Sequence, residues 1–431
     1  MAFLVWGLLV LWGLQAWERA IAPPPAPPPG DALVAAPWDE VAGLLRSPAG
    51  LDQWAAALEA SAGYYAKRPA GSSYVFTVEA GNRLSSVEGG GRHPPSIKAH
   101  AGLTVDAAVM ARACRELAGL ARGGDAGLLL ERLRRDYLLL RSIGSNGAGE
   151  VLVTGYYEPT LQGSREPSPR FAQPLYRRPP DLLEADLGAW FPELKGKRLV
   201  ARVENGSLRP YHDRSAIDGG ALRDRGLELV WVDDPVEAFI LQIQGSGRVQ
   251  MTDGSELRVG YDGANGHPYR AIGGLLVAEG HLTREELTLP ALRQWLAQHP
   301  DQVTRVLHHN QSYIFFRALA GPALGNIQVP LTPGHSVATD HRLFPRGAPA
   351  LLVTRRPLFD AEDSPTPRAW EPMARLVVNQ DTGGAIRGAG RVDWFLGPGA
   401  EAERVAGVMK EAGSRLYFIA PRPGVPGASG Q

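Results

Sequence analysis

The chain has 431 residues, and its 45 basic and 45 acidic side chains give a formal net charge of zero. This balance supplies no electrostatic attraction to nucleic acid or to anionic lipid, so we expect neither as a partner. Hydrophobic residues make up 44% and charged residues 21%, which excludes a disordered or collagen-like chain. The 51 glycines and 36 prolines favour many turns and short strands over long helices.

The first 33 residues have an unusual composition. Residues 2–14 form an unbroken apolar run that is too short to span a bilayer comfortably. We therefore expect residues 1–22 to be a signal peptide or a short N-terminal anchor. The tract PPPAPPP at 23–29 predicts an extended spacer, so residues 23–33 are interpreted as a proline-rich linker. Membrane attachment would depend on the N-terminal segment alone, because the single cysteine, Cys114, excludes a cysteine-anchored lipoprotein.

Apolar residues at three-and-four spacing predict helices over the next part of the chain. The segments with this pattern are 38–47, 51–67, 105–121 and 126–140. Residues 74–78 interrupt them and are predicted to be extended. Cys114 is expected to lie in the buried face of its helix.

After Gly144 the segments become short and rich in Val, Tyr and Phe, which is typical of strands. Strands are predicted at 151–157, 227–232, 238–243, 248–251, 312–316, 350–354, 374–379, 391–397 and 415–421. Residues 282–300 are predicted to be helical, with Thr283 as N-cap and Glu286 completing a capping box. The Gly/Pro/Ser-rich residues 422–431 predict a disordered tail.

Several kinds of chemical site are excluded by the motifs. The ten histidines are scattered without ligand spacing, there is no HExxH and there is one cysteine, so we expect no metal site. No phosphate loop and no dinucleotide-binding loop occur, so no cofactor is expected. The GxSxG motif of a nucleophile elbow is also absent.

Two aspartates in LVVNQDTGGAIRGAGRVDWFLGPG are candidates for acid–base chemistry. Asp381 follows an apolar strand and opens a glycine turn. Asp393 lies between Val392 and Trp394, so strand alternation projects it from the opposite face. A carboxyl group desolvated in this way has a raised pKa and can act as a general acid. The alternative is that each aspartate caps a turn or is solvated.

The motifs together resemble a known family. LTPGHSVATDHRLFPRGAPALL and LVVNQDTGGAIRGAGRVDWFLGPG resemble the three-aspartate (3D) domain, whose aspartates fall on Asp340, Asp381 and Asp393. Upstream, VTGYYEPTLQGS, AFILQIQGSGRVQMTDGS, YDGANGHPYRAIGGLL and HHNQSYIFFR resemble the membrane-bound lytic murein transglycosylase A family, in that family's order.

The resemblance implies a mainly β fold with N-terminal helices. It implies a double-psi β-barrel domain made from residues 34–160 and 303–421. A second β-rich, glycan-binding domain is inserted at 161–302. A groove between the two domains would hold a glycan strand.

The resemblance also implies a reaction, the non-hydrolytic cleavage of the β-1,4 bond between N-acetylmuramic acid and N-acetylglucosamine. This leaves 1,6-anhydro ends and serves cell-wall turnover in the periplasm or cell envelope, with peptidoglycan strands and cell-wall synthesis or hydrolysis complexes as partners. The family's catalytic aspartate falls on Asp393 as general acid and base. Asp381 would support it, and Asp340 would be structural.

Groove-lining candidates come from three motifs in the same resemblance. Flat aromatic rings and amide side chains suit sugars, and glycines allow close backbone approach. Strand alternation also allows the reading that one of the adjacent tyrosines belongs to the core. The candidates are Thr154, Gly155, Tyr156, Tyr157, Gln244, Gly245, Ser246, Gly247, Asn265, Gly266, Tyr269 and Arg270.

Two rival functions remain open at this point. Asp381-Thr382-Gly383 has the form of an aspartic protease motif, but such an enzyme needs two aspartates that share a proton, and the chain has one such motif. The other rival is a glycan-binding protein without catalysis, against which the presence of Asp393 weighs. Detection of 1,6-anhydro ends in digested peptidoglycan distinguishes all three.

Overall fold

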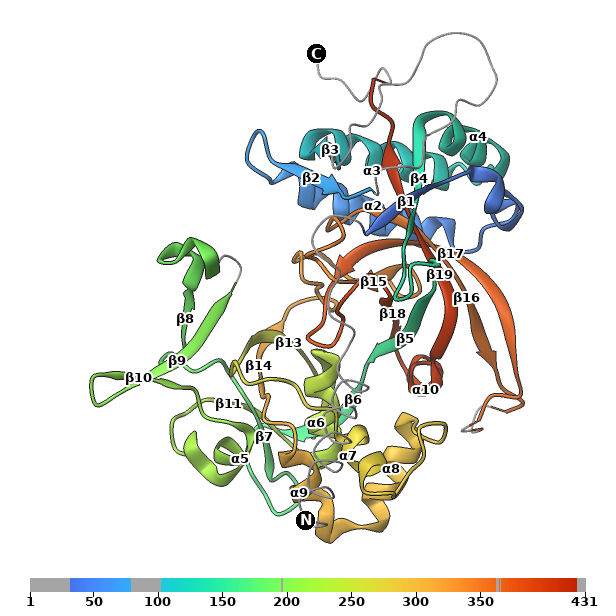
Figure 1. Cartoon of the computed structure of the whole chain (residues 1–431). Coiled ribbons are helices and arrows are strands. Elements are labelled where there is room, and N and C mark those ends of the chain that lie inside the picture. Colours follow the sequence, from blue (N-terminus) through green and yellow to red (C-terminus); the bar gives the residue numbers. More distant parts are fainter. Residues whose placement is uncertain (1–31, 79–101, 195–196, 362–363, 365, 425–431) are drawn as a thin grey trace, which may run out of the picture.

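The chain folds into two β-rich units, a barrel covered at one end by helices and a second unit built on a six-stranded sheet (Figure 1). The structure is a computed structural model that describes residues 32–78, 102–194, 197–361, 364 and 366–424. The predicted N-terminal segment 1–22, the linker up to residue 31 and the tail from 425 onward lie outside the described residues. No helix in the described ranges is both long enough and apolar enough to cross a bilayer.

The barrel is formed by an eight-stranded sheet in the order β1-β4-β19-β16-β17-β15-β18-β5. Strand β5 also pairs with β19, so six of these strands close on themselves while β4 and β1 extend the sheet. Two pairings are parallel, β5 with β18 and β15 with β17. The strands are β1 (Leu33–Ala36), β4 (Tyr137–Ser142), β5 (Val151–Glu158), β15 (Ser336–Ala338), β16 (Pro349–Leu358), β17 (Ala369–Asp381), β18 (Arg391–Pro398) and β19 (Lys410–Pro421). The mainly β prediction is confirmed in this closed barrel.

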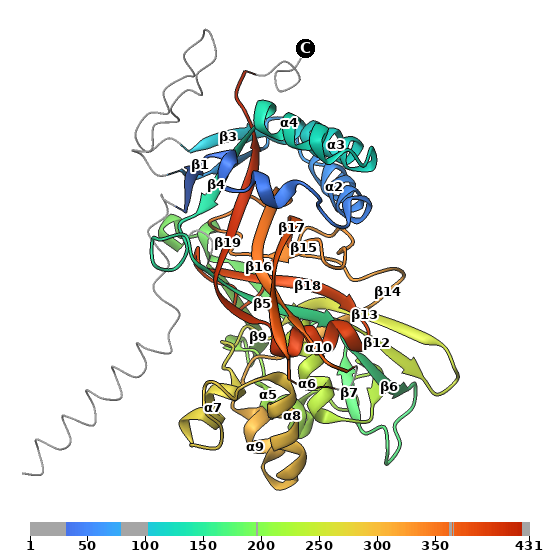
Figure 2. The same cartoon turned by 90° about the vertical axis from the view of Figure 1, so that its right-hand side faces the viewer.

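Helices from the N-terminal third cover one end of the barrel (Figure 2). Their buried faces join the barrel strands in one core, in which Trp54 and Cys114 are fully buried. The predicted burial of Cys114 is thereby confirmed. The cover consists of η1 (Trp38–Glu40), η2 (Ala42–Leu45), α2 (Leu51–Ala66), α3 (Ala107–Arg122), α4 (Ala126–Asp136) and the hairpin β2 (Ser73–Phe76) with β3 (Leu103–Asp106).

Two of the helix predictions in this region need correction. Residues 38–47 form two short 3-10 turns rather than an α-helix, because neither turn has a side-chain cap and Gly43 weakens helix propensity within the second turn. Residues 137–140 were predicted to continue the last helix but form β4 between β1 and β19, buried at all four positions. A short apolar run does not distinguish a buried strand from a buried helix.

The second unit has a six-stranded sheet in the order β14-β13-β12-β6-β11-β7. Its strands are β6 (Thr160–Ser164), β7 (Gln173–Tyr176), β11 (Glu228–Val232), β12 (Ser246–Met251), β13 (Glu256–Ala264) and β14 (Ile314–Leu319). Its helices are α5 (Arg214–Ala216), η5 (Ile217–Ala221), α6 (Pro235–Gln244), α7 (Ile272–Ala278), α8 (Leu289–Gln298), η6 (Pro300–Gln302) and α9 (Val303–His308).

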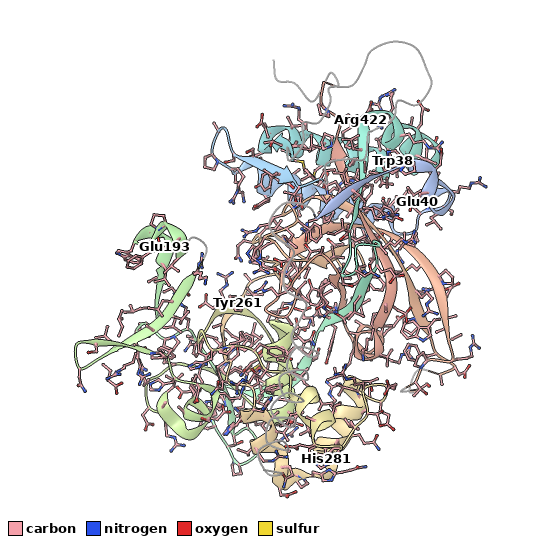
Figure 3. All side chains as sticks on the ribbon, viewed as in Figure 1. Trp38, Glu40, Glu193, Tyr261, His281 and Arg422 are labelled. Carbon is pink, nitrogen blue, oxygen red and sulfur yellow. The ribbon has the colours of Figure 1, made fainter. Side chains whose placement is uncertain are left out.

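A three-stranded arm projects from the second unit (Figure 1). Its elements are β8 (Leu183–Asp186), η3 (Leu187–Ala189), η4 (Pro192–Leu194), β9 (Arg198–Glu204) and β10 (Ser207–Pro210). Glu193 lies at the outer end of this arm, and Tyr261 lies on β13 of the main sheet (Figure 3).

The strand predicted at 238–243 is wrong, because this segment is helix α6. The helix begins after Asp234, whose side chain accepts from the backbone N–H of Val236 and Glu237, and Pro235 occupies its first turn. It ends at Gly245, which has a left-handed conformation with φ of 80°. Phe239 packs against helices on one side and Leu241 against the sheet on the other, so the segment shows no helical period in sequence.

The remaining strand predictions are confirmed within a few residues at each end. The predicted capping box also forms, because the Thr283 N–H donates to Glu286 and the Glu286 N–H donates back to Oγ1 of Thr283. However, it closes only one turn. Helix α8 begins later, at Leu289, with Thr288 as its N-cap. Helix α10 (Ala400–Val408) was not predicted.

Candidate active site

Asp393 lies on β18, where this strand is paired on both sides. Its partners in register are Thr154 on the parallel strand β5 and Ala338 on β15. Thr154 Oγ1 donates a hydrogen bond of 2.7 Å to Asp393 Oδ1. Val392 and Trp394 are buried on the opposite face, as the alternation predicts. Asp393 Oδ2 accepts no hydrogen bond from the residues that the structure describes, and the side chain is partly exposed.

Asp381, at the end of β17, is held by three hydrogen bonds. Its Oδ1 accepts from the backbone N–H groups of Asn326 and Thr382, each at 2.9 Å. Its Oδ2 accepts from the hydroxyl of Tyr156 at 2.9 Å. Three donors aimed at one carboxyl group favour its ionised form and fix its orientation. Asp381 therefore has the geometry of a supporting carboxylate, whereas one oxygen of Asp393 accepts no hydrogen bond from the described part of the chain.

Both carboxyl groups titrate above their usual range. Burial raises the pKa of Asp381 to about 6, and the nearby charge of Asp393 acts in the same direction. Burial also raises the pKa of Asp393, against the opposing effects of the Thr154 hydrogen bond and the Arg391 charge. Burial and both carboxylates raise the pKa of Tyr156, so its hydroxyl stays protonated and can donate. The arrangement can hold and release a proton close to neutral pH.

Arg391 is a site residue that the sequence analysis missed. It lies two residues before Asp393 on β18, and its Nη2 donates to Thr154 Oγ1 at 3.3 Å. The signal was available, because residues two apart on a strand share a face. When the partner strand is unknown, however, the sequence predicts that an arginine in a strand is solvated.

Asp340 is fully buried and belongs to the loop after β15. Its carboxylate accepts from the backbone N–H of Gly388 and from both the backbone and the guanidinium of Arg342. Burial raises the pKa of Asp340, but these hydrogen bonds outweigh burial and hold it below its usual range. A carboxylate bonded in this way ties its loop to the turn between Asp381 and Asp393.

Tyr156 and Tyr157 lie on opposite faces of β5. The Tyr156 hydroxyl contacts Asp381, and its ring packs against Phe395. The Tyr157 hydroxyl contacts Glu403 and Arg293 instead. Both rings are buried, at 8% and 1% exposure, so only Tyr156 belongs to the aspartate cluster.

The glycine-rich candidates serve mainly packing in this structure. A Cβ at Gly155 would lie 2.8 Å from Leu396 Cδ1 and 2.9 Å from Cα of Ala406. A Cβ at Gly247 would lie 2.9 Å from the carbonyl oxygen of Pro159 and closer still to a leucine methyl group. Gly245 ends helix α6.

The polar candidates of the second unit are held mostly by backbone. Gln244 accepts from the backbone N–H of Tyr157 and so links the second unit to β5. Asn265 is buried, with its amide bonded to the backbone of His212, Gln311 and Tyr313. Ser246 is buried, and Gly266, Tyr269 and Arg270 are exposed. Within the described residues, no hydrogen bond or ion pair joins these four to Asp393. Nor do the described residues contain a group of three His, Cys, Asp or Glu able to hold a metal ion.

Comparison with known proteins places these features in a family. The family described as MltA specific insert domain matches residues 152–317, and the 3D domain matches residues 335–419. The curated protein named membrane-bound lytic murein transglycosylase A of Escherichia coli K12 is 33% identical over 284 residues, covering 65% of this chain and 68% of the relative.

Several solved structures are similar to this chain. A membrane-bound lytic murein transglycosylase from Agrobacterium tumefaciens aligns with a TM-score of 0.62 and 33% identity, covering 72% of this chain and 84% of that one. MltA of E. coli with bound chitohexaose aligns with a TM-score of 0.56 and 28% identity, covering 71% and 82%.

Proposed function

The chain belongs to the membrane-bound lytic murein transglycosylase A family, and from this membership we propose that it cleaves peptidoglycan strands as a lytic transglycosylase. The bond broken is the β-1,4 link between N-acetylmuramic acid and N-acetylglucosamine. The product ends are 1,6-anhydro-N-acetylmuramic acid. The chitohexaose in the E. coli relative supports a glycan strand as the substrate class.

Asp393 is the proposed general acid and base. In the first half of the reaction its carboxyl proton passes to the glycosidic oxygen as the bond from that oxygen to the anomeric carbon breaks. In the second half the 6-hydroxyl oxygen of the same muramic acid bonds to the anomeric carbon and returns its proton to the Asp393 carboxylate. One group suffices because the nucleophile is tethered in the substrate, so no water need be activated.

One observation carries this assignment. Asp393 has one oxygen bonded to Thr154 and the other without a hydrogen-bond partner among the described residues, whereas both oxygens of Asp381 accept hydrogen bonds. Asp381 accordingly has the supporting role, in which its hydrogen bonds hold the turn next to Asp393. Asp340 holds the loop after β15 against the turn between Asp381 and Asp393, and it takes no part in proton transfer.

The finer architecture is proposed on the same basis. The two parallel pairings within the closed barrel, β5 with β18 and β15 with β17, support the double-psi topology that the family resemblance implies. We place the glycan strand between the barrel and the inserted unit, which extends beyond the boundary of 302 expected from the resemblance, because β14 pairs with β13 in its sheet. The substrate implies action in the cell envelope, in the periplasm and alongside other cell-wall enzymes.

The test is Asp393→Asn assayed on purified peptidoglycan sacculi, with 1,6-anhydro ends counted by mass spectrometry. Asn is nearly isosteric but carries no acid proton, so we expect a loss of about four orders of magnitude or more with an unchanged melting temperature. Asp340→Asn is the comparison, and it should lower stability by about 2 kcal/mol while each folded molecule keeps its turnover. More than about a tenth of wild-type turnover in Asp393→Asn would overturn the assignment.

A further inference from the structure

Arg391 lies half-buried beside the proposed acid, yet none of the roles above uses it. We propose that Arg391 is a positioning residue that acts through Thr154, directing the Thr154 hydroxyl proton onto Asp393 Oδ1 and thereby assigning the transferable proton to Asp393 Oδ2. The proposal rests on the role of Asp393 given above. It adds which carboxyl oxygen reacts and which residue decides this.

The strand register brings the three side chains together. Arg391 and Asp393 are two residues apart on β18, so they point to the same face. The parallel neighbour β5 places Leu152 opposite Arg391 and Thr154 opposite Asp393. The Thr154 hydroxyl therefore lies within reach of both charged groups, at 3.3 Å from Arg391 Nη2 and 2.7 Å from Asp393 Oδ1.

The direction of each hydrogen bond follows from donor chemistry. A guanidinium group has donors and no acceptor, so the bond from Arg391 must end on a lone pair of Thr154 Oγ1. The single hydroxyl proton of Thr154 is then left to point at Asp393 Oδ1. A serine or threonine hydroxyl can normally rotate and exchange roles, and Arg391 removes this freedom.

The consequence for Asp393 concerns both halves of the reaction. When Asp393 is neutral, a proton on Oδ1 would face the hydroxyl proton of Thr154, so the acid proton resides on Oδ2. That oxygen has no partner among the described residues and belongs to a partly exposed side chain. After proton donation, the Thr154 hydrogen bond and the Arg391 charge both stabilise the carboxylate that must form.

The placement of Arg391 is costly for stability. Its Nη1 is buried and makes no hydrogen bond in the part of the chain that the structure describes. Burial lowers the pKa of Arg391, and the charge of Asp393 opposes this. A buried charge without full hydrogen bonding destabilises a fold, so a structural role does not account for this geometry.

The other titratable groups around Asp393 have partners of their own and do not take over the action of Arg391 on Thr154 and Asp393. From β17, Asp381 is already bonded to Tyr156 of β5. Strand β15 has no titratable residue. From α10, Glu403 pairs with Arg293 and Tyr157, and Tyr157 lies on the far face of β5. From β19, Lys410 is the register partner of Thr154, and its Nζ donates to the backbone carbonyl of Arg284. Arg391 is therefore the cation whose charge lowers the pKa of Asp393.

The experiment is a pH profile of kcat, measured by release of 1,6-anhydro ends, for Arg391→Met and Thr154→Val. Activity requires protonated Asp393, so it falls as pH rises through the apparent pKa of the aspartate pair. Each variant removes a group that stabilises the carboxylate, so this alkaline limb should move up by about one pH unit. The kcat at the optimum should fall about tenfold, with KM little changed.

Conservative variants separate positioning from packing. Arg391→Lys keeps a donor-only cation and Thr154→Ser keeps the hydroxyl, so each should return the alkaline limb close to its wild-type position. In the Thr154→Val background, adding Arg391→Met should cost less kcat than it does alone, because the two act in series. Arg356→Met, which removes an exposed arginine paired with Glu371, is the matched control and should leave the profile unchanged.

Several outcomes would overturn the inference. An Arg391→Met enzyme with the wild-type profile and kcat would do so, as would full additivity of the two substitutions. If Arg391→Met does not fold, Thr154→Val and Thr154→Ser are compared instead. Identical pH profiles of kcat for these two variants would show that the Thr154 hydroxyl does not act on Asp393 and would refute the proposal. An active Asp393→Asn would instead refute the proposed function, so the two failures are distinguishable.

Discussion

Two neighbouring tyrosines show how a single residue step separates functions on a strand. Tyr156 and Tyr157 occupy successive positions of β5, so their hydroxyls lie on opposite faces. Tyr156 donates to Asp381 beside the proposed acid. Tyr157 contacts an arginine and a glutamate that connect the two units. The same substitution at each position therefore tests the two faces separately.

We expect Tyr156→Phe to lower turnover about tenfold or more and to lower the melting temperature as well. The lost bond ends on a carboxylate, and such hydrogen bonds contribute roughly 1.5–3 kcal/mol. The remaining donors to Asp381 are backbone N–H groups, which the substitution leaves in place. Turnover on sacculi and thermal melting of the same preparation measure the two effects.

Tyr157→Phe is the matched comparison and should lower stability without a comparable loss of turnover. It should lower stability by about 1 kcal/mol, since a side-chain hydrogen bond is lost, and keep most of the turnover. Equal losses of turnover in Tyr156→Phe and Tyr157→Phe would contradict the assignment of catalysis to one face of β5.

At the scale of elements, strand β5 positions the site. It pairs with β18 in parallel and with β19 antiparallel, and so closes the barrel, and the chain then continues into β6 of the second unit. Helix α10 packs across β5 and β18. Gly155 lies at the closest approach, because any larger residue would meet the backbone of this helix at Ala406. The glycine thus sets the spacing that holds Thr154 against Asp393.

We expect Gly155→Ala to destabilise the fold by about 1–3 kcal/mol, the usual cost of an overpacked contact. Turnover should fall as well, since relieving the clash displaces either α10 or the adjacent Thr154. Circular dichroism melts and kcat on sacculi are the measurements.

Gly274→Ala is the control for this substitution. Gly274 lies in α7 with no atom within 4 Å of a Cβ placed on it, so alanine should raise stability by about 0.5–1 kcal/mol through helix propensity. If Gly155→Ala changes neither stability nor turnover, helix α10 can move away from β5 without strain, which would contradict the prediction.

At the scale of the whole molecule, a polar cluster joins the two units. Arg293 on α8 bonds to Glu403 on α10, to Tyr157 on β5 and to Glu237 on α6, the last at 2.7 Å. Burial raises the pKa of Glu237, although the Arg293 hydrogen bond opposes the increase. One cation thus holds two carboxylates, one from each unit, on the face of β5 opposite the aspartates.

We expect Arg293→Met to lower stability by about 1–2 kcal/mol, because it leaves two partly buried carboxylates without their cation. Hydrogen exchange should increase in α8 and α10 more than in the barrel strands, which would report loosening between the units. Arg305→Met, which removes an exposed pair with Glu279 inside the second unit, should leave both readouts near wild type. Unchanged exchange in α8 and α10 would show that other contacts hold the units together.

Much of this protein can be predicted from the sequence. Most strands after Gly144 carry Val, Tyr and Phe runs between turn residues, and two of the N-terminal helices, α2 and α3, show the helical period. Local signals specify such elements because a half-buried strand or helix alternates apolar and polar residues. The sequence also proposes Asp393 as the acid and Asp381 as its support, through a glycine turn and a family resemblance covering both.

Other features were decided only by the tertiary structure. Residues 137–140 and helix α6 are buried on more than one side, so their sequences carry no period, and their partners determine whether they are strand or helix. The position of Arg391 beside Thr154 depends on the parallel register of two strands more than 230 residues apart. No local pattern records such pairing, because the energy that selects it comes from side chains distant in sequence that meet only in the closed barrel.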